Sequence, residues 1–221
     1  MRRRTVCAAL ALLALALAVP AVAEAFLATI TNPADPGATP SCPGSATVPC
    51  TVVSRTTAIQ VEVGTAHDPF KITATARIVG WQIALSAPTA AQVRFFDEHE
   101  GGSPEAALAI VRPSHALEYR LDYVSPLVHL EPYFGRTATF ALPTSVLVHK
   151  GDEIALSVPT WAPALELNAG RRAAWRASRA TGACNKVTLE TAQLQLGGVS
   201  EYSCIYRTAL IDFGAIEIST P

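Results

Sequence analysis

Apolar residues alternate with polar ones along much of the chain, and a period of two is the signature of β-strands. The clearest run, residues 117–124, has an apolar face and a charged face, as expected of a sheet with one side in water. Its predicted buried residues are Leu117, Tyr119, Leu121 and Tyr123. Further strands are predicted at residues 58–63, 71–77, 78–86, 92–96, 107–111, 137–142, 146–149, 153–158, 187–196 and 204–218.

One hairpin stands out near the middle of the chain. The turn Lys150-Gly151-Asp152 separates two apolar runs, and its glycine can adopt the positive φ that a tight turn needs. In the second run Ile154, Leu156 and Val158 are predicted to be buried. Helical periodicity is nearly absent, residues 171–180 being its one plausible place, and the last strand is expected to bend at Gly214. The pattern predicts an all-β fold, an antiparallel β-sandwich with little helix.

The N-terminal segment has the three parts of a signal peptide. Three arginines precede an apolar run at residues 6–19, and the small residues Ala21 and Ala23 form an A-x-A cleavage motif. The run is shorter than the roughly 20 residues of a membrane-spanning helix. We therefore predict a signal peptide at 1–23, an irregular Pro/Gly-rich lead-in at 24–50 and one β-sandwich domain at 51–221, in a secreted, extracellular protein without a membrane span.

Loss of the leader removes three of the 17 basic residues and leaves 18 acidic ones, so nucleic acid is not an expected partner. The remaining cysteines are Cys42, Cys50, Cys184 and Cys204. An even number in an exported chain predicts two disulfides. Three pairings are open, and we favour the local ones, 42 with 50 and 184 with 204. Zinc is disfavoured because no C-x-x-C spacing occurs and no histidine lies near.

The sequence resembles two kinds of exported protein. The strand Gly80-Trp81-Gln82-Ile83, the predicted strand at residues 92–96 and the turn 150–152 before an apolar strand resemble secreted jelly-roll modules, including carbohydrate-binding ones. The stretches 159–165 and 175–179 resemble an uncharacterised family of exported actinobacterial β-sandwich proteins, and this likeness covers most of the mature chain. The first resemblance implies a jelly-roll-like sandwich, and the second implies export. Neither implies an activity.

Two tryptophans are the candidate ligand-binding residues. Trp161 lies between Pro159 and Pro163, and an exposed, rigidly held indole could stack on a sugar ring. The alternative is an indole that folds back and caps one end of the sandwich. Trp175 lies among arginines, where cation–π pairing on an exposed face competes with packing onto the sheet.

A weaker candidate is an oxygen-rich loop. Asp97, Glu98 and Glu100 precede Gly101 and Gly102, and their carboxylates could bind calcium, although the spacing matches no EF-hand and a solvated loop is the alternative. No other cofactor is expected. No nucleophile elbow or H-E-x-x-H motif occurs, so an enzyme is not expected.

These observations favour a secreted, non-catalytic β-sandwich that binds a carbohydrate or another cell-surface ligand. The partner would then be a polysaccharide. Two alternatives stay open: a structural or protein-interaction component of the cell envelope, with an envelope protein as its partner, and a hydrolase whose site has no recognised motif.

Overall fold

The computed structural model of the protein describes residues 26–32, 39–186 and 191–219. The predicted signal peptide, residues 1–23, lies outside this part of the chain. Residues 187–190, the first part of a predicted strand, also lie outside it.

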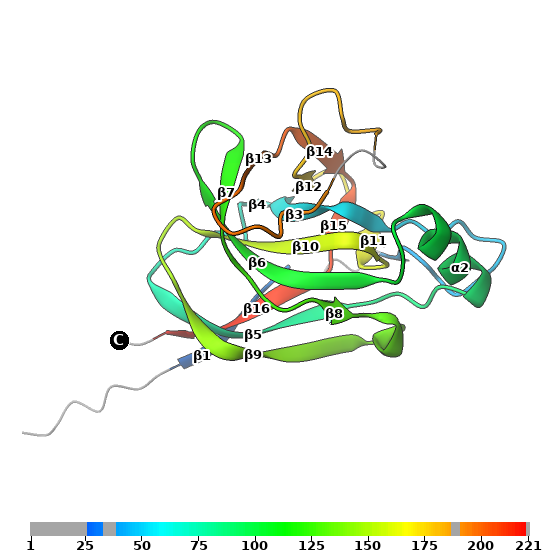
Figure 1. The fold of residues 1–221 in the computed structure, drawn as a ribbon, viewed down its shortest axis with the longest axis horizontal. Helices are drawn as coiled ribbons and strands as arrows, with labels where there is room; N and C mark the ends of the chain where they lie inside the picture. The colour runs from blue at the N-terminus through cyan, green and yellow to red at the C-terminus, as the bar shows by residue number, and fades with distance from the viewer. Residues whose placement is uncertain (1–25, 33–38, 187–190, 220–221) are drawn as a thin grey trace, which may run out of the picture.

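Three antiparallel sheets make up the fold (Figure 1). The four-stranded sheet has the order β1 (Phe26–Thr31), β16 (Phe213–Ser219), β5 (Ala76–Ala84), β9 (Thr137–Val148). The nine-stranded sheet has the order β13 (Val199–Glu201), β7 (Glu118–Val124), β6 (Glu105–Pro113), β10 (Glu153–Ala162), β3 (Val53–Val63), β12 (Ala173–Ala177), β14 (Cys204–Arg207), with β4 (Ala66–His67) beside β3 and β8 (Val128–His129) beside β6. A small sheet has the order β15 (Ala209–Ile211), β11 (Leu165–Leu167), β2 (Thr39–Pro40). The described helices are α2 (Ala90–His99) and a 3₁₀ turn (Glu131–Tyr133).

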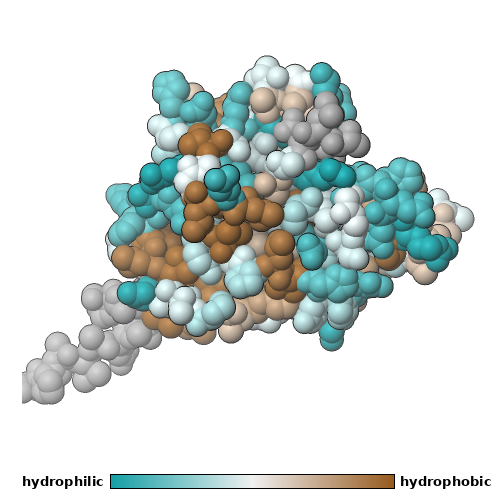
Figure 2. All heavy atoms as spheres, in the orientation of Figure 1, coloured by the Kyte–Doolittle hydropathy of each residue, from teal (hydrophilic) through white to brown (hydrophobic). Residues whose placement is uncertain are grey.

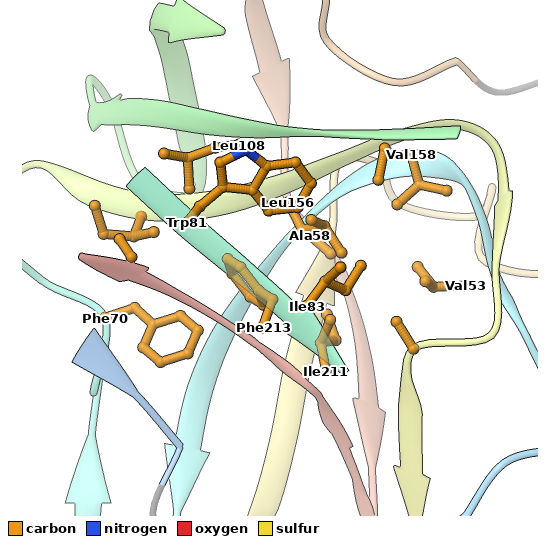
Figure 3. Close-up of a cluster of buried hydrophobic side chains, with 14 of the residues drawn as sticks. Val53, Ala58, Phe70, Trp81, Ile83, Leu108, Leu156, Val158, Ile211 and Phe213 are labelled. Atoms are coloured by element: carbon orange, nitrogen blue, oxygen red, sulfur yellow. The ribbon is translucent and has the colours of Figure 1, made fainter. Parts of the chain in front are cut away.

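The two larger sheets pack face to face and enclose the main core (Figure 3). The four-stranded sheet contributes Trp81, Ile83 and Phe213, and the nine-stranded sheet contributes Leu108 and Leu156, all of them buried. Removing these apolar surfaces from water is the main favourable contribution to folding. The predicted all-β, antiparallel sandwich is confirmed.

The alternation of apolar residues predicts β10 well and β7 only in part. Ile154, Leu156 and Val158 are fully buried in the main core, as predicted. In β7, Leu121 lies opposite Val111 while Tyr123 lies opposite Ile110, so one residue of β7 is extra at this point. Such a β-bulge turns the following side chains to the other face. Leu121 and Tyr119 therefore pack in a second cluster on the outer face, whereas Tyr123 packs against the main core.

The strand predicted at residues 92–96 is wrong, because this segment belongs to helix α2. Thr89 caps the helix: its hydroxyl accepts a hydrogen bond from the backbone N–H of Gln92, and the Gln92 side chain accepts one from the backbone N–H of Thr89. This capping box offsets the β preference of Val93, Phe95 and Phe96. The helix buries Phe96 and turns a hydrophilic surface outward (Figure 2).

Several other boundaries differ from the prediction. Residues 26–31, assigned to the irregular lead-in, form edge strand β1, whose last three residues, Thr29, Ile30 and Thr31, are all β-branched and favour an extended backbone. Strands are predicted at residues 71–77 and 187–196, but residues 71–75 form only one isolated β-bridge and residues 191–196 form no strand. The helix suggested at residues 171–180 is wrong, because this segment contains strand β12. The final segment breaks at Thr208, which has a positive φ of 63°, and at Asp212. Gly214 instead lies inside β16, where a Cβ would be 2.5 Å from the Ile30 carbonyl oxygen.

Both disulfides have the predicted local pairing, Cys42–Cys50 and Cys184–Cys204. The first closes a loop within the Pro-rich lead-in, between β2 and β3, and the second joins the segment after β12 to β14. Within the described residues, no helix has the length and apolar character that crossing a membrane requires.

Candidate functional site

Trp161 lies inside the protein, so the prediction of an exposed indole is wrong. Its side chain is 0% exposed, and its ring centroid lies 5.1 Å from that of Phe96 and 5.8 Å from that of Phe134. The indole Nε1 donates hydrogen bonds of 3.0 Å to the Asp97 carboxylate and to the Gly102 carbonyl. The flanking prolines do not form a rigid loop: β10 continues through Pro159 with a bulge, and α2 covers the end of the strand.

The candidate calcium ligands do not converge on one point. Asp97 accepts the Trp161 hydrogen bond, and Glu100 faces Arg55 with 3.8 Å between Oε2 and Nε. Glu98 is exposed on the last turn of α2. Calcium needs six to eight oxygens around a single centre. Within the described residues no group of three His, Cys, Asp or Glu side chains could hold a metal ion. Asp97 and Glu100 instead link the helix and the residue after it to β10 and β3.

Trp175 packs onto the sheet, which is the alternative given for it above. Its side chain is 5% exposed and stacks on Tyr206, with centroids 4.4 Å apart and planes inclined by 21°. The cation near this pair, Arg179, lies 5.8 Å above the Tyr206 ring rather than over Trp175. Trp175 therefore offers no exposed face for a sugar, although it lines a pocket together with residues of β3, β11 and β14.

A site that the sequence did not reveal lies where the small sheet meets the sandwich. Leu165 pairs with Ile211 in the β11–β15 ladder, and the backbone N–H of Asp212 donates to the Ala164 carbonyl at 2.8 Å. Asp212 is thus opposite Ala164, and Glu166 is its diagonal neighbour across the ladder. Diagonal positions of this kind come within reach of long side chains. The two carboxyl groups are close enough to interact, and Glu166 contributes to a raised pKa of Asp212.

The surroundings of Asp212 raise its pKa. Burial contributes most to raising the pKa of Asp212 from 3.8 to about 7, and the interaction with the adjacent Glu166 carboxyl group contributes the rest. A carboxyl group that is withdrawn from water and faces a like charge retains its proton to higher pH. At neutral pH, Asp212 can therefore act as a donor while Glu166 acts as an acceptor.

The pair lies at the junction of two pockets. One has a volume of about 310 Å³ and apolar walls that include Leu85 and Leu165, and the other has a volume of about 250 Å³. Ala84, Glu166 and Asp212 line both. Together they form a cleft in the size range of small-molecule sites, with an aspartate of raised pKa, Asp212, lining both parts. This combination makes the cleft the best candidate for a binding site.

The second pocket adds uncharged polar groups to the cleft. Its lining includes Thr31, Gln82 and Thr137, which belong to three strands of the four-stranded sheet. Asn32 follows β1, and its Nδ2 donates to the Ile211 carbonyl at 2.6 Å. The Oδ1 of Asn32 is buried and has no hydrogen-bond partner in the described part of the chain. Buried acceptors are rarely left unpaired, so this oxygen is suited to a donor from a ligand.

The lead-in helps to build the first pocket. Pro40, Cys42 and Pro43 line it, and the backbone N–H of Ser41 donates to the Leu165 carbonyl at 3.0 Å. Cys42 is held by its disulfide to Cys50. The backbone N–H of Ala84 donates to the Asp212 carbonyl at 2.9 Å and joins β5 to the carboxyl pair. The lead-in and its disulfide thus form one wall of a preformed cleft.

No family model, curated protein or solved structure matches this chain.

Proposed function

We propose that this is a secreted, non-catalytic binding protein that takes a neutral carbohydrate in the cleft around Glu166 and Asp212. The observation that carries the proposal is that two neighbouring carboxyl groups, Glu166 and Asp212, line both of two adjoining pockets. The predicted leader and the two disulfides support export, since disulfides persist in oxidising compartments.

The side chains of the cleft match the hydrogen-bonding needs of sugar hydroxyls. A hydroxyl group both donates and accepts, so it is best satisfied by a mixture of acceptors and donors. Glu166 accepts, protonated Asp212 donates, and the Gln82 amide does both. Apolar wall residues of the first pocket, Leu85 and Leu165, can contact the C–H face of a sugar ring.

The negative charge of the cleft favours neutral over acidic carbohydrates. The pair carries net negative charge at neutral pH, and no Lys or Arg is among the described residues lining either pocket. A uronic acid would bring a second like charge into a poorly solvated site, which is unfavourable. Neutral oligosaccharides are therefore the expected ligands.

The test is calorimetric titration of the mature protein with neutral gluco-, xylo-, manno- and chito-oligosaccharides at pH 7. We expect saturable binding of at least one series, and at least tenfold weaker binding by Asp212→Asn and Glu166→Gln, since loss of a hydrogen bond to a charged group costs about 1.5–3 kcal/mol. Glu118→Gln, an exposed change on β7, is the matched control and should bind normally. Binding that these cleft variants leave unchanged would contradict the proposal.

A second candidate, hydrolysis, is favoured by the raised pKa of Asp212 beside a second carboxyl group. A protonated and an ionised carboxyl group side by side can act as general acid and general base, as in aspartic proteases. Glycosidases place their carboxyl groups about 5–10 Å apart to admit water or a sugar, so peptide bonds fit this geometry better. Peptide cleavage near pH 6 that Asp212→Asn abolishes would support this candidate and displace the binding proposal.

A further inference from the structure

A second cavity, separate from the carboxyl pair, lies at the other side of the small sheet. It has a volume of about 510 Å³, within the range of small-molecule sites. Strands β3, β11, β12 and β14 contribute its walls together with the segment that holds Cys184. Most of its surface is apolar and includes Val53, Leu167 and Trp175.

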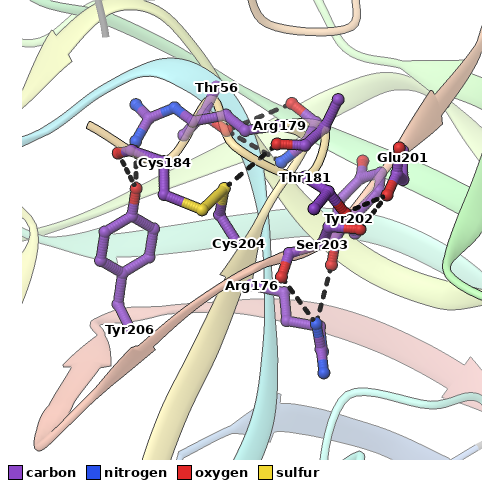
Figure 4. The surroundings of a disulfide bond; sticks show 12 residues. Thr56, Arg176, Arg179, Thr181, Cys184, Glu201, Tyr202, Ser203, Cys204 and Tyr206 are labelled. Carbon is purple, nitrogen blue, oxygen red and sulfur yellow. Dashed lines mark hydrogen bonds between the residues drawn. A yellow bond between two sulfur atoms is a disulfide. The ribbon is translucent and has the colours of Figure 1, made fainter. Parts of the chain in front are cut away.

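Arg179 brings a positive charge to this cavity. Its side chain is 4% exposed, and the guanidinium group donates to the Tyr206 hydroxyl at 2.5 Å and to the Ser54 carbonyl at 2.6 Å. Tyr206 in turn donates to the Cys184 carbonyl at 2.8 Å, beside the disulfide (Figure 4). The partners of the guanidinium are therefore neutral.

No counter-ion is provided for this charge within the described residues. The ion pairs found there involve other basic side chains, and the Arg179 Nε is buried without a hydrogen-bond partner. Trp175 Nε1 is a second buried donor without a partner, on another wall residue of the same cavity. Arg207 also lines the cavity, but it is more than half exposed at 58% and its guanidinium group lies 3.5 Å from the Glu62 carboxylate, so its charge is already paired. Buried charges are costly unless they are paired.

We propose that this cavity binds a small organic carboxylate whose apolar body fills the space between Val53, Leu167 and Trp175. A carboxylate matches the planar fork of a guanidinium and would supply the missing negative charge. The apolar walls exclude a small hydrated anion as the best ligand, because such an ion would leave the apolar surface empty. This site is independent of the cleft at Asp212, and it selects the opposite charge.

The test uses benzoate, phenylacetate and hexanoate, each compared with its neutral alcohol, and inorganic phosphate as a bare anion. A ligand that binds the native state raises the melting temperature in a concentration-dependent way. We expect at least one carboxylate to do so with an affinity at least tenfold above that of its alcohol. No effect of any carboxylate, an equal effect of the alcohols, or a stronger effect of phosphate would overturn the proposal.

Two variants and a control test whether the carboxylate binds in this cavity. Arg179→Gln should lower carboxylate affinity at least tenfold, while Arg172→Gln, an exposed change outside the cavity, should leave it unaltered. If Arg179→Gln does not fold, Leu167→Trp fills the cavity instead and should abolish binding. Full binding by a folded Arg179→Gln or Leu167→Trp variant would refute the assignment.

Discussion

Replacing Trp161 with alanine is expected to lower the free energy of unfolding by about 4 kcal/mol, as truncation of a buried tryptophan usually does. The side chain is wholly enclosed beneath α2, and it also holds the loop after the helix through Asp97 and Gly102. In a chain of this size such a loss corresponds to a fall of about 10 °C in melting temperature. Urea unfolding and thermal melts both measure it.

Phe95→Ala is the matched control for this change. Phe95 lies on the same helix and is 53% exposed, so its loss should cost less than about 0.5 kcal/mol. A Trp161→Ala variant as stable as Phe95→Ala would mean that the indole is not part of the core, and the exposed-indole hypothesis would then return.

The second large effect is a loss of stability as pH rises from 5 to 8.5. Burial raises the pKa of Glu153 to about 8 from 4.5, with the Asp68 carboxylate adding to the shift and Lys71 opposing it. The pKa of Asp212 is likewise raised, to about 7 from 3.8, by burial and then by Glu166. Both carboxyl groups hold their protons more tightly in the folded state than in the unfolded chain.

The sign of the effect follows from linkage. Between the unfolded and folded pKa values the native state binds more protons, so stability is greatest at the acidic end and falls as pH rises through about 7 and 8. We expect a combined loss on the order of 3 kcal/mol, well below the full value of the two shifts because buried sites relax around a charge. The lowered pKa of Glu201 acts in the opposite direction at more acidic pH, outside this window.

Glu153→Gln isolates one part of the effect. Since an amide cannot ionise, this variant should be about as stable as the parent at pH 5 and on the order of 2 kcal/mol more stable at pH 8.5. The exposed change Glu118→Gln should leave the pH profile unaltered. A parent whose stability is flat or rises between pH 5 and 8.5 would contradict the assigned shifts.

The sequence predicted the elements in which local pattern and tertiary packing agree. In β10 the apolar residues Ile154, Leu156 and Val158 are buried as predicted, but the intervening residues are buried too, because a second cluster covers the other face of the sheet. The favoured local disulfides are the ones formed. The pattern failed where one residue changed the register, as in β7 near Asp122, and where a cap outweighed β preference, as at Thr89. The Thr89–Gln92 spacing was the available signal for the helix.

The candidate site could not be predicted from the pattern of residues along the chain. Glu166 and Asp212 belong to no motif, and only the β11–β15 ladder makes them neighbours. The burial of Arg179, and its position beside Tyr206 of β14, likewise arise only in the folded protein. Trp161 misled the prediction because Pro159 suggested a loop, whereas the proline occupies a bulge inside a strand.

The central claim is that Asp212 retains its proton to neutral pH in an open cleft. Carboxyl ¹³C NMR of the protein, titrated from pH 3 to 9, measures this directly when Asp212→Asn is used to assign the resonance. The account predicts a titration step for Asp212 near pH 7. An Asp212 resonance that titrates near pH 4, as in an ordinary exposed aspartate, would contradict it.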